Sequence, residues 1–424
     1  MTRRKALVIS PTGREYKWLP GIADELGCEL VFDDFAGSFF DDVVGGGAES
    51  APEVVPLIEG TARRYRAAGL AGVTSGVAYP GMTAAAVVAR RLGLRGPDVR
   101  SVLLCEHKYY SRLAQRRLVP DATPGFGLVD PQRPRAPEGL SFPLFVKPVK
   151  SSFSMNARLV SSEEELRELV APGPMPEAYL KPFDDLLRRY TDFEAGGRNF
   201  IAESPLEGAQ VSLEGYAFGG RVHTLGIIDS VMYPGTISFR RFQYPSRLPA
   251  EVQRRMSRVA EEFIRGVGYD DALFNVEFIY DAGRDALHVV EVNPKIASQF
   301  TDLFEKVDGS SSYRTLLQAA LGDEPDFERG AGPFRVAASC VLRRFEDGRV
   351  LRVPSAEEVE ALRSKFPDAR VEVTAEEGRR LSDVMQDGKS FRYCVVNLGA
   401  GSEKELEEKL ELCESALDFR FAPP

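Results

Sequence analysis

Short apolar runs and helical patterns alternate over the first hundred residues of the chain. Residues 6–10, 29–32 and 71–74 have the composition of buried strands, and the spacing of apolar positions predicts a helix over residues 83–92. Strands that alternate with helices usually build a parallel sheet. We therefore predict a small α/β domain over residues 1–105.

The pattern changes in the middle of the chain, where strand-like segments follow one another closely. Gly219 and Gly220 separate two of them as a hairpin turn, and a helical pattern covers residues 249–265. This spacing predicts a mostly antiparallel domain over residues 106–330. The expected strands are residues 144–148, 178–181, 199–203, 210–218, 221–228, 273–280 and 287–292.

A third pattern begins after the turn-rich residues 330–333. Strand-like segments return, and helical patterns cover residues 355–365 and 402–417. The sequence therefore predicts a C-terminal α+β subdomain over residues 331–424.

Composition narrows the classes of function. The 424 residues are 43% hydrophobic and 28% charged, as in folded soluble proteins, and the net charge of −9 argues against nucleic acid or a membrane surface as a partner. Five cysteines in so long a chain are unlike a disulfide framework, and we find no apolar run long enough for an export signal or a membrane span. We expect a soluble, cytoplasmic protein.

The two late strands of the central domain have a polar face. Because side chains alternate along a strand, Asn275 and Glu277 share one face, as do Glu291 and Asn293. If the strands form a hairpin, these oxygens can meet above an apolar core and suit Mg²⁺. The alternative is an ordinary solvated sheet face.

Two further segments have weaker signals for a nucleotide site. Lys147 ends an apolar strand and is followed by Ser151, Ser152 and Ser154, so an ammonium group and backbone N–H groups could surround a polyphosphate. The apolar strand that runs through residues 200–208 into a polar turn could offer backbone groups to a purine edge. An exposed lysine and an ordinary strand end are the alternatives.

The order of these features resembles the ATP-grasp family of carboxylate-amine ligases. The ending of the chain, residues 391–399 and a helix, looks like the C-terminal subdomain of members that join amino acids. The resemblance implies an ATP-grasp fold with an N-terminal parallel α/β domain, a central antiparallel domain whose residues 142–205 form a small ATP lid, and a C-terminal lid-like subdomain. The features are Lys108 in Glu106-His-Lys-Tyr109, Lys147 with its serine loop, Glu203 to Leu206, Glu277, and Glu291-x-Asn293.

The resemblance also implies roles for single residues. Lys108, Lys147 and the serines would contact the phosphates of ATP, and Glu203 and the backbone near Leu206 would hold the adenine. Mg²⁺, with Mn²⁺ as a substitute, would bind the oxygens of the two late strands. The implied metal ligands are Glu277, Glu291 and Asn293, and the implied substrate-facing residues are Glu214, Lys295, Arg240 and Arg241. A pair of surface-loop arginines is the alternative for the last two.

Two residues depart from the family pattern. Gln210 stands where many members have a glutamate for the ribose. Lys295 stands where many have an arginine, so a positive charge is kept at this position but the two-pronged geometry of a guanidinium group is lost.

We expect a ligase that activates a small carboxylate, with an amino acid on at least one side, as an acyl phosphate and joins it to an amine. The alternatives are an enzyme that modifies a peptide or protein terminus and a nucleotide-binding protein without ligase activity. A homodimer is expected from the family.

Overall fold

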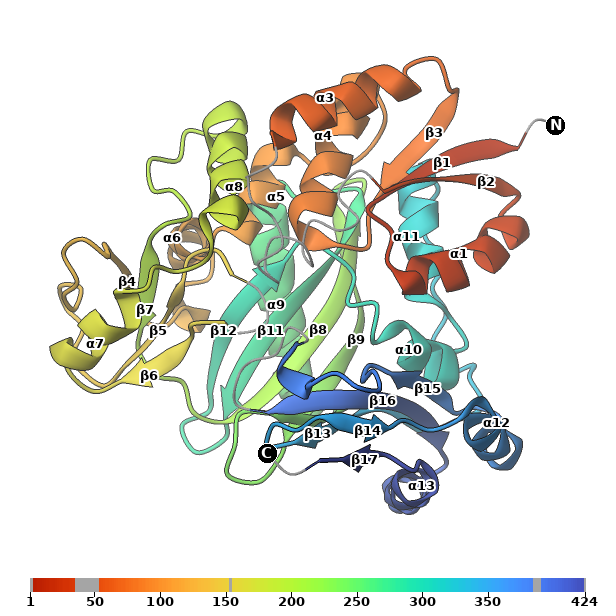
Figure 1. Ribbon diagram of the computed structural model, residues 1–424. Helices are drawn as coiled ribbons and strands as arrows, with labels where there is room; N and C mark the ends of the chain where they lie inside the picture. The colour runs from red at the N-terminus through yellow and green to blue at the C-terminus, as the bar shows by residue number, and fades with distance from the viewer. Residues whose placement is uncertain (1–2, 35–52, 152–154, 384–389, 423–424) are drawn as a thin grey trace.

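The computed structural model describes residues 3–34, 53–151, 155–383 and 390–422 (Figure 1). Its N-terminal part is a parallel sheet of three strands in the order β2-β1-β3, as the alternating pattern predicted. Residues 6–9 of β1 are all buried, which explains their unbroken apolar run. The elements are β1 (Arg4–Ile9), β2 (Cys28–Asp33), β3 (Leu70–Thr74), α1 (Gly13–Glu25), α3 (Val54–Tyr65) and α4 (Thr83–Leu92).

Two helices connect this sheet to the rest of the chain. Helix α5 (Val99–Glu106) ends at His107, and α6 (Lys108–Leu118) begins directly after it. The His107 side chain accepts a hydrogen bond from the backbone N–H of Tyr110 and so caps α6. Lys108 is therefore the first residue of a helix.

A small four-stranded antiparallel sheet follows, in the order β4-β7-β5-β6. The strand predicted over residues 178–181 is wrong, because these residues belong to α8. The apolar positions that follow them continue at helical spacing, and this longer run decides the structure. The elements are β4 (Phe126–Val129), β5 (Leu144–Pro148), β6 (Arg158–Val160), β7 (Phe200–Glu203), α7 (Glu163–Val170) and α8 (Glu177–Tyr190).

The largest sheet has eight antiparallel strands in the order β12-β11-β8-β9-β10-β13-β16-β15. Gly219 and Gly220 turn between β8 and β9 with φ of 58° and 78°, so the predicted hairpin is present. Strand β10 pairs with β13, so the predicted boundary at residue 330 falls between strands of one continuous sheet. The strands are β8 (Ala209–Phe218), β9 (Arg221–Met232), β10 (Phe239–Tyr244), β11 (Ala272–Asp281), β12 (Ala286–Asn293), β13 (Val336–Arg344), β15 (Arg370–Val373) and β16 (Phe391–Ala400).

Helices and two short strands surround this sheet (Figure 1). Helix α11 returns to the N-terminal sheet, where a Cβ atom on Gly72 of β3 would lie 2.2 Å from the carbonyl oxygen of Ala320. Glycine is therefore required for this close approach. The elements are α9 (Ala250–Gly266), α10 (Thr301–Asp308), α11 (Ser312–Leu321), α12 (Ala356–Lys365), α13 (Glu403–Ala416), β14 (Val350–Arg352) and β17 (Arg420–Phe421).

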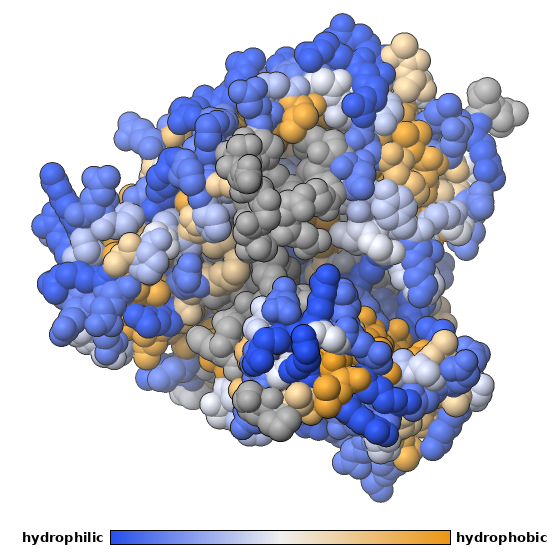
Figure 2. Space-filling model, viewed as in Figure 1, coloured by the Kyte–Doolittle hydropathy of each residue, from blue (hydrophilic) through white to orange (hydrophobic). Residues whose placement is uncertain are grey.

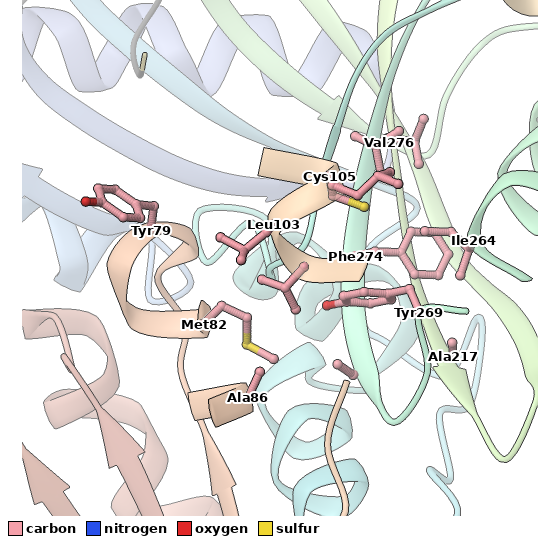
Figure 3. Close-up of a cluster of buried hydrophobic side chains, with 14 of the residues drawn as sticks. Tyr79, Met82, Ala86, Leu103, Cys105, Ala217, Ile264, Tyr269, Phe274 and Val276 are labelled. Carbon is pink, nitrogen blue, oxygen red and sulfur yellow. The ribbon is translucent and has the colours of Figure 1, made fainter. Parts of the chain in front are cut away.

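One hydrophobic core joins the N-terminal helices to the large sheet. Figure 3 shows Tyr79 and Met82 on one side, Leu103 of α5 in the middle, and Phe274 and Val276 of β11 beyond. This packing places the junction of α5 and α6 against the sheet. Polar residues cover most of the face in Figure 2, and among the described helices none combines the length and apolar character needed to cross a membrane.

Candidate active site

Two carboxylates face each other on adjacent strands of the large sheet. Glu277 of β11 pairs directly with Glu291 of β12, and Asn275 pairs with Asn293. The amide nitrogen of Asn293 lies 3.3 Å from the amide oxygen of Asn275, to which it donates a hydrogen bond. The predicted hairpin with a shared polar face is therefore present.

The charges around this pair are unevenly distributed. Burial and the neighbouring charge of Glu291 raise the pKa of Glu277 to about 7. Burial also opposes ionisation of Glu291, but the ammonium groups of Lys108 and Lys147 hold its pKa below the usual value. Lys108 Nζ lies 3.4 Å from Glu291 Oε2, and Gln210 Nε2 donates to Glu277 Oε2 at 3.0 Å. The predicted ribose residue thus contacts a predicted metal ligand.

A third carboxylate lies on the next strand of the sheet. Glu214 of β8 is fully buried, accepts hydrogen bonds from Asn275 Nδ2 at 2.7 Å and from the N–H of Ala297 at 3.2 Å, and burial raises its pKa to about 8. The positive charge of half-buried Lys295 acts on both Glu214 and Glu277. The structure therefore brings these predicted residues together.

Glu203 is held between two cations at the end of β7. Arg112 Nε donates to one carboxylate oxygen at 2.7 Å, and Lys147 Nζ lies 3.0 Å from the other. Both cations also donate to the carbonyl oxygen of Val290. Although burial opposes ionisation, Arg112 and Lys147 lower the pKa of Glu203 to about 2. Leu206 lies nearby in the chain, half-buried in the connection from β7 to β8.

The resemblance to the family includes Arg112 downstream of Lys108, but sequence reasoning assigned it no role, although its side chain is only 2% exposed. It lies four residues after Lys108 in α6, so both residues are on one face of the helix. This spacing is the signal that could have given it a role beside Lys108.

Lys108 also contacts the segment that follows β5. Its ammonium group donates to the carbonyl oxygen of Ser151 at 3.3 Å, and its backbone N–H donates to Val149 at 3.0 Å. Ser152 and Ser154 lie outside the described residues.

Arg240 and Arg241 lie elsewhere in the sheet. They belong to strand β10, not to a loop, and both guanidinium groups pair with Glu407 of α13. Strands β8 and β9 separate β10 from the carboxylates of β11. Their predicted contact with substrate therefore has no support from the residues that surround them.

The site offers few acidic side chains as ligands for a metal ion. Within the described ranges, no three or more His, Cys, Asp and Glu side chains are grouped so that they could hold a metal ion. The paired carboxylates are instead accompanied by amide groups, those of Asn275, Asn293 and Gln210.

Comparison with known proteins identifies the central part of the chain. Residues 140–302, which include both Lys147 and the paired carboxylates, match the family model of the ATP-grasp domain. The chain contains an ATP-grasp domain. The resemblance predicted from the order of the motifs is thereby confirmed.

A curated relative matches over part of the chain. The C-terminal section of the carbamoyl phosphate synthase large chain from Methanopyrus kandleri is 24% identical over 217 residues, which is 51% of this chain. The match spans 37% of the length of that relative.

Solved structures show that the chain has the ATP-grasp fold along its whole length. The L-amino acid ligase from Bacillus licheniformis is 20% identical, with a TM-score of 0.73 over the full length of both chains. The phosphoribosylglycinamide synthetase from Anaerococcus prevotii is 13% identical, with a TM-score of 0.67 over 99% of this chain and 100% of that one. The N5-carboxyaminoimidazole ribonucleotide synthetase from Thermus thermophilus is 19% identical, with a TM-score of 0.65 over 97% and 98%.

Proposed function

We propose that the protein is an ATP- and Mg²⁺-dependent ligase that joins a small carboxylate, an amino acid in the first instance, to an amine. The observation that supports this most is the pair Glu277 and Glu291, half-buried together beside the ammonium groups of Lys108 and Lys147. Acids and cations side by side suit a nucleotide bound with its metal, because each charge then has a partner. The similarity to an amino acid ligase along the full chain agrees with this proposal.

The residues fit a divalent cation. Burial and repulsion by Glu291 raise the pKa of Glu277, and a bound cation would relieve that repulsion. Glu277, Glu291 and Asn293 would hold Mg²⁺, which when bound neutralises charge on the phosphates of ATP.

Lys108 and Lys147 would bind the ATP phosphates. Lys108 lies at the edge of the pair, 3.4 Å from Glu291, and Lys147 connects the pair to Glu203. The adenine would lie toward Glu203 and the backbone near Leu206, and Gln210 would accept a hydrogen bond from the ribose.

The reaction would have two steps. A carboxylate oxygen of the first substrate attacks the γ-phosphorus of ATP, the bond to the β-phosphate oxygen breaks, and an acyl phosphate and ADP form. The amine nitrogen of the second substrate then attacks the acyl carbon, loses a proton, and displaces inorganic phosphate to give an amide. Lys295, beside Glu214 and Glu277, would compensate the negative charge of the acyl phosphate.

The test measures ADP and phosphate release from ATP and Mg²⁺ with pooled amino acids and small carboxylates, followed by mass spectrometry. We expect amine-dependent ADP release and a product whose mass is the sum of two substrates minus water. ATP binding without turnover on any pool would favour a peptide or protein terminus as the acceptor, and no ATP binding would contradict the proposal.

A further inference from the structure

A buried ion pair lies next to the proposed phosphate site. Lys150 Nζ lies 3.4 Å from Glu106 Oε2, and the two side chains are 6% and 1% exposed. Glu106 is the last residue of α5, and Lys150 follows the end of β5 by two residues. The pair therefore joins the N-terminal helices to the small four-stranded sheet.

Three other elements surround the pair. The ammonium group of Lys150 lies over the rings of Tyr79 and Phe183, 4.4 and 4.7 Å from their centroids. Thr83 donates to Glu106 Oε2 at 3.2 Å, while Glu106 Oε1 is buried without a hydrogen-bond partner. The charge of Lys150 is thus held in one place by contacts on several sides.

Stability alone does not explain why an ion pair, and not two apolar side chains, occupies the positions of Glu106 and Lys150. A buried ion pair with an unsatisfied carboxylate oxygen is usually no more stable than apolar side chains of similar size. Leucine and methionine could fill the same volume between the aromatic rings at lower cost.

The neighbours of the pair in the chain suggest another reason. Glu106 precedes Lys108 by two residues, and Lys150 precedes Ser151, whose carbonyl oxygen accepts from Lys108 Nζ at 3.3 Å. His107 between them is fully buried, and its Nε2 lies 3.0 Å from the carbonyl oxygen of Ala195. Displacing either charge would therefore shift the start of α6, where Lys108 lies, and the Ser151 carbonyl oxygen to which Lys108 donates.

We propose that Glu106 and Lys150 are positioning residues that hold the Lys108 ammonium group, and the Ser151 carbonyl oxygen that accepts from it, in the geometry that binds the ATP phosphates. This inference rests on the proposed function, because it assigns the phosphates to Lys108. Neither residue contacts the nucleotide in this account. Their effect is on ATP affinity, with a smaller effect on the chemical step.

The ion pair should also make ATP affinity depend on pH. Burial lowers the pKa of Lys150 to about 8, and the charges that act on it come from Glu106, Lys108 and Glu291. The uncharged rings of Tyr79 and Phe183 and the buried His107 complete its surroundings. Above about pH 8 the ammonium group loses its proton, so the pair with Glu106 is lost.

The experiment compares the wild-type chain with Lys150→Met, Glu106→Gln and the double variant Glu106→Leu/Lys150→Met. The control is Lys306→Met, which breaks an equally buried ion pair with Asp302 inside α10. The measurements are the calorimetric Kd of ATP with Mg²⁺, the KM and kcat for ADP release, and the urea midpoint of unfolding.

We expect the double variant to unfold at the wild-type midpoint or above it, while its Kd and KM for ATP rise about tenfold and kcat changes less. The wild-type Kd should weaken between pH 7 and 9.5 more steeply than that of Lys150→Met, and the control should keep the wild-type Kd. An unchanged Kd in the double variant, or an equal loss in the control, would overturn the inference. Because Kd is measured without turnover, ATP binding without ligase activity would refute the proposed function alone.

Discussion

Two charge clusters lie side by side in this chain, and they differ in the balance of acidic and basic groups. In the first, Glu203 is held by Arg112 and Lys147, and these cations lower its pKa to about 2. In the second, Glu214, Glu277 and Glu291 lie on three neighbouring strands, and the pKa values of Glu214 and Glu277 are raised to about 8 and about 7.

From this difference we infer which cluster binds the metal. Glu203 has two counterions within the chain, so its charge is compensated without a ligand. In the acidic cluster, burial and neighbouring carboxylates raise the pKa values of Glu214 and Glu277, and a cation held by Glu277 and Glu291 would offset the repulsion between those two. The second cluster is therefore where we place the metal and the phosphates.

The largest expected effect concerns the acidic cluster. Glu291→Gln should lower ADP release at least 100-fold, because it removes a carboxylate that would hold Mg²⁺ and face the phosphates. A coupled ADP assay measures this, with Glu261→Gln of α9, whose side chain is partly exposed, as a control. Retention of more than a tenth of the wild-type rate would show that the acidic cluster is not the catalytic one.

The next effect concerns the cluster around Glu203. Glu203→Gln should lower the free energy of unfolding by about 4 kcal/mol at pH 7, because two buried cations lose their partner. The lowered pKa means that the carboxylate contributes stability above about pH 4.5 and loses it as the pH falls toward 2.

Urea unfolding of wild type and Glu203→Gln at pH 7 and pH 3 measures this effect. The difference between the two proteins should be smaller at pH 3. An equal difference at both pH values would mean that packing and not charge explains the loss.

Glu214 should show the opposite pH dependence. Its raised pKa keeps it protonated in the folded chain, whereas the unfolded chain releases that proton above about pH 4.5, so wild-type stability falls as the pH rises toward 8. Glu214→Gln is neutral at every pH. Its stability relative to wild type should increase by about 3 kcal/mol between pH 5 and pH 8.

Urea unfolding of both proteins across this pH range is the measurement. A constant difference would show that Glu214 is ionised in the folded protein.

The smallest effect is expected at Arg240, outside both clusters. Arg240→Gln removes a partly exposed pair with Glu407, so we expect a stability loss below about 1 kcal/mol and ADP release within twofold of wild type. The ADP assay and a thermal unfolding curve measure these. A tenfold loss of activity with unchanged stability would instead support the contact between Arg240 and substrate that was predicted from the sequence.

Alternation along single strands predicted much of the acidic cluster. The shared faces of Asn275 with Glu277 and of Glu291 with Asn293 followed from the period of two, and the register then placed them opposite each other. The order of the motifs along the chain predicted the fold, because that order matches the ATP-grasp family and can be found without knowing any distance between residues.

Contacts between distant segments could not be predicted in the same way. The partner of Arg112 is 91 residues away, and that of Arg241 is 166 residues away, so neither follows from a local pattern. Residues 178–181 show a different limit, since four apolar-rich residues suit a strand or a helix until the longer period is considered.

The most direct test is calorimetric titration of ATP into the wild-type chain and into Glu277→Gln, each with Mg²⁺ and with a chelator. We predict that Mg²⁺ tightens ATP binding at least tenfold in the wild type and much less in Glu277→Gln, because the acidic cluster needs the cation. ATP binding of equal affinity with and without Mg²⁺ in the wild type would contradict the assignment of the metal and the phosphates to this cluster.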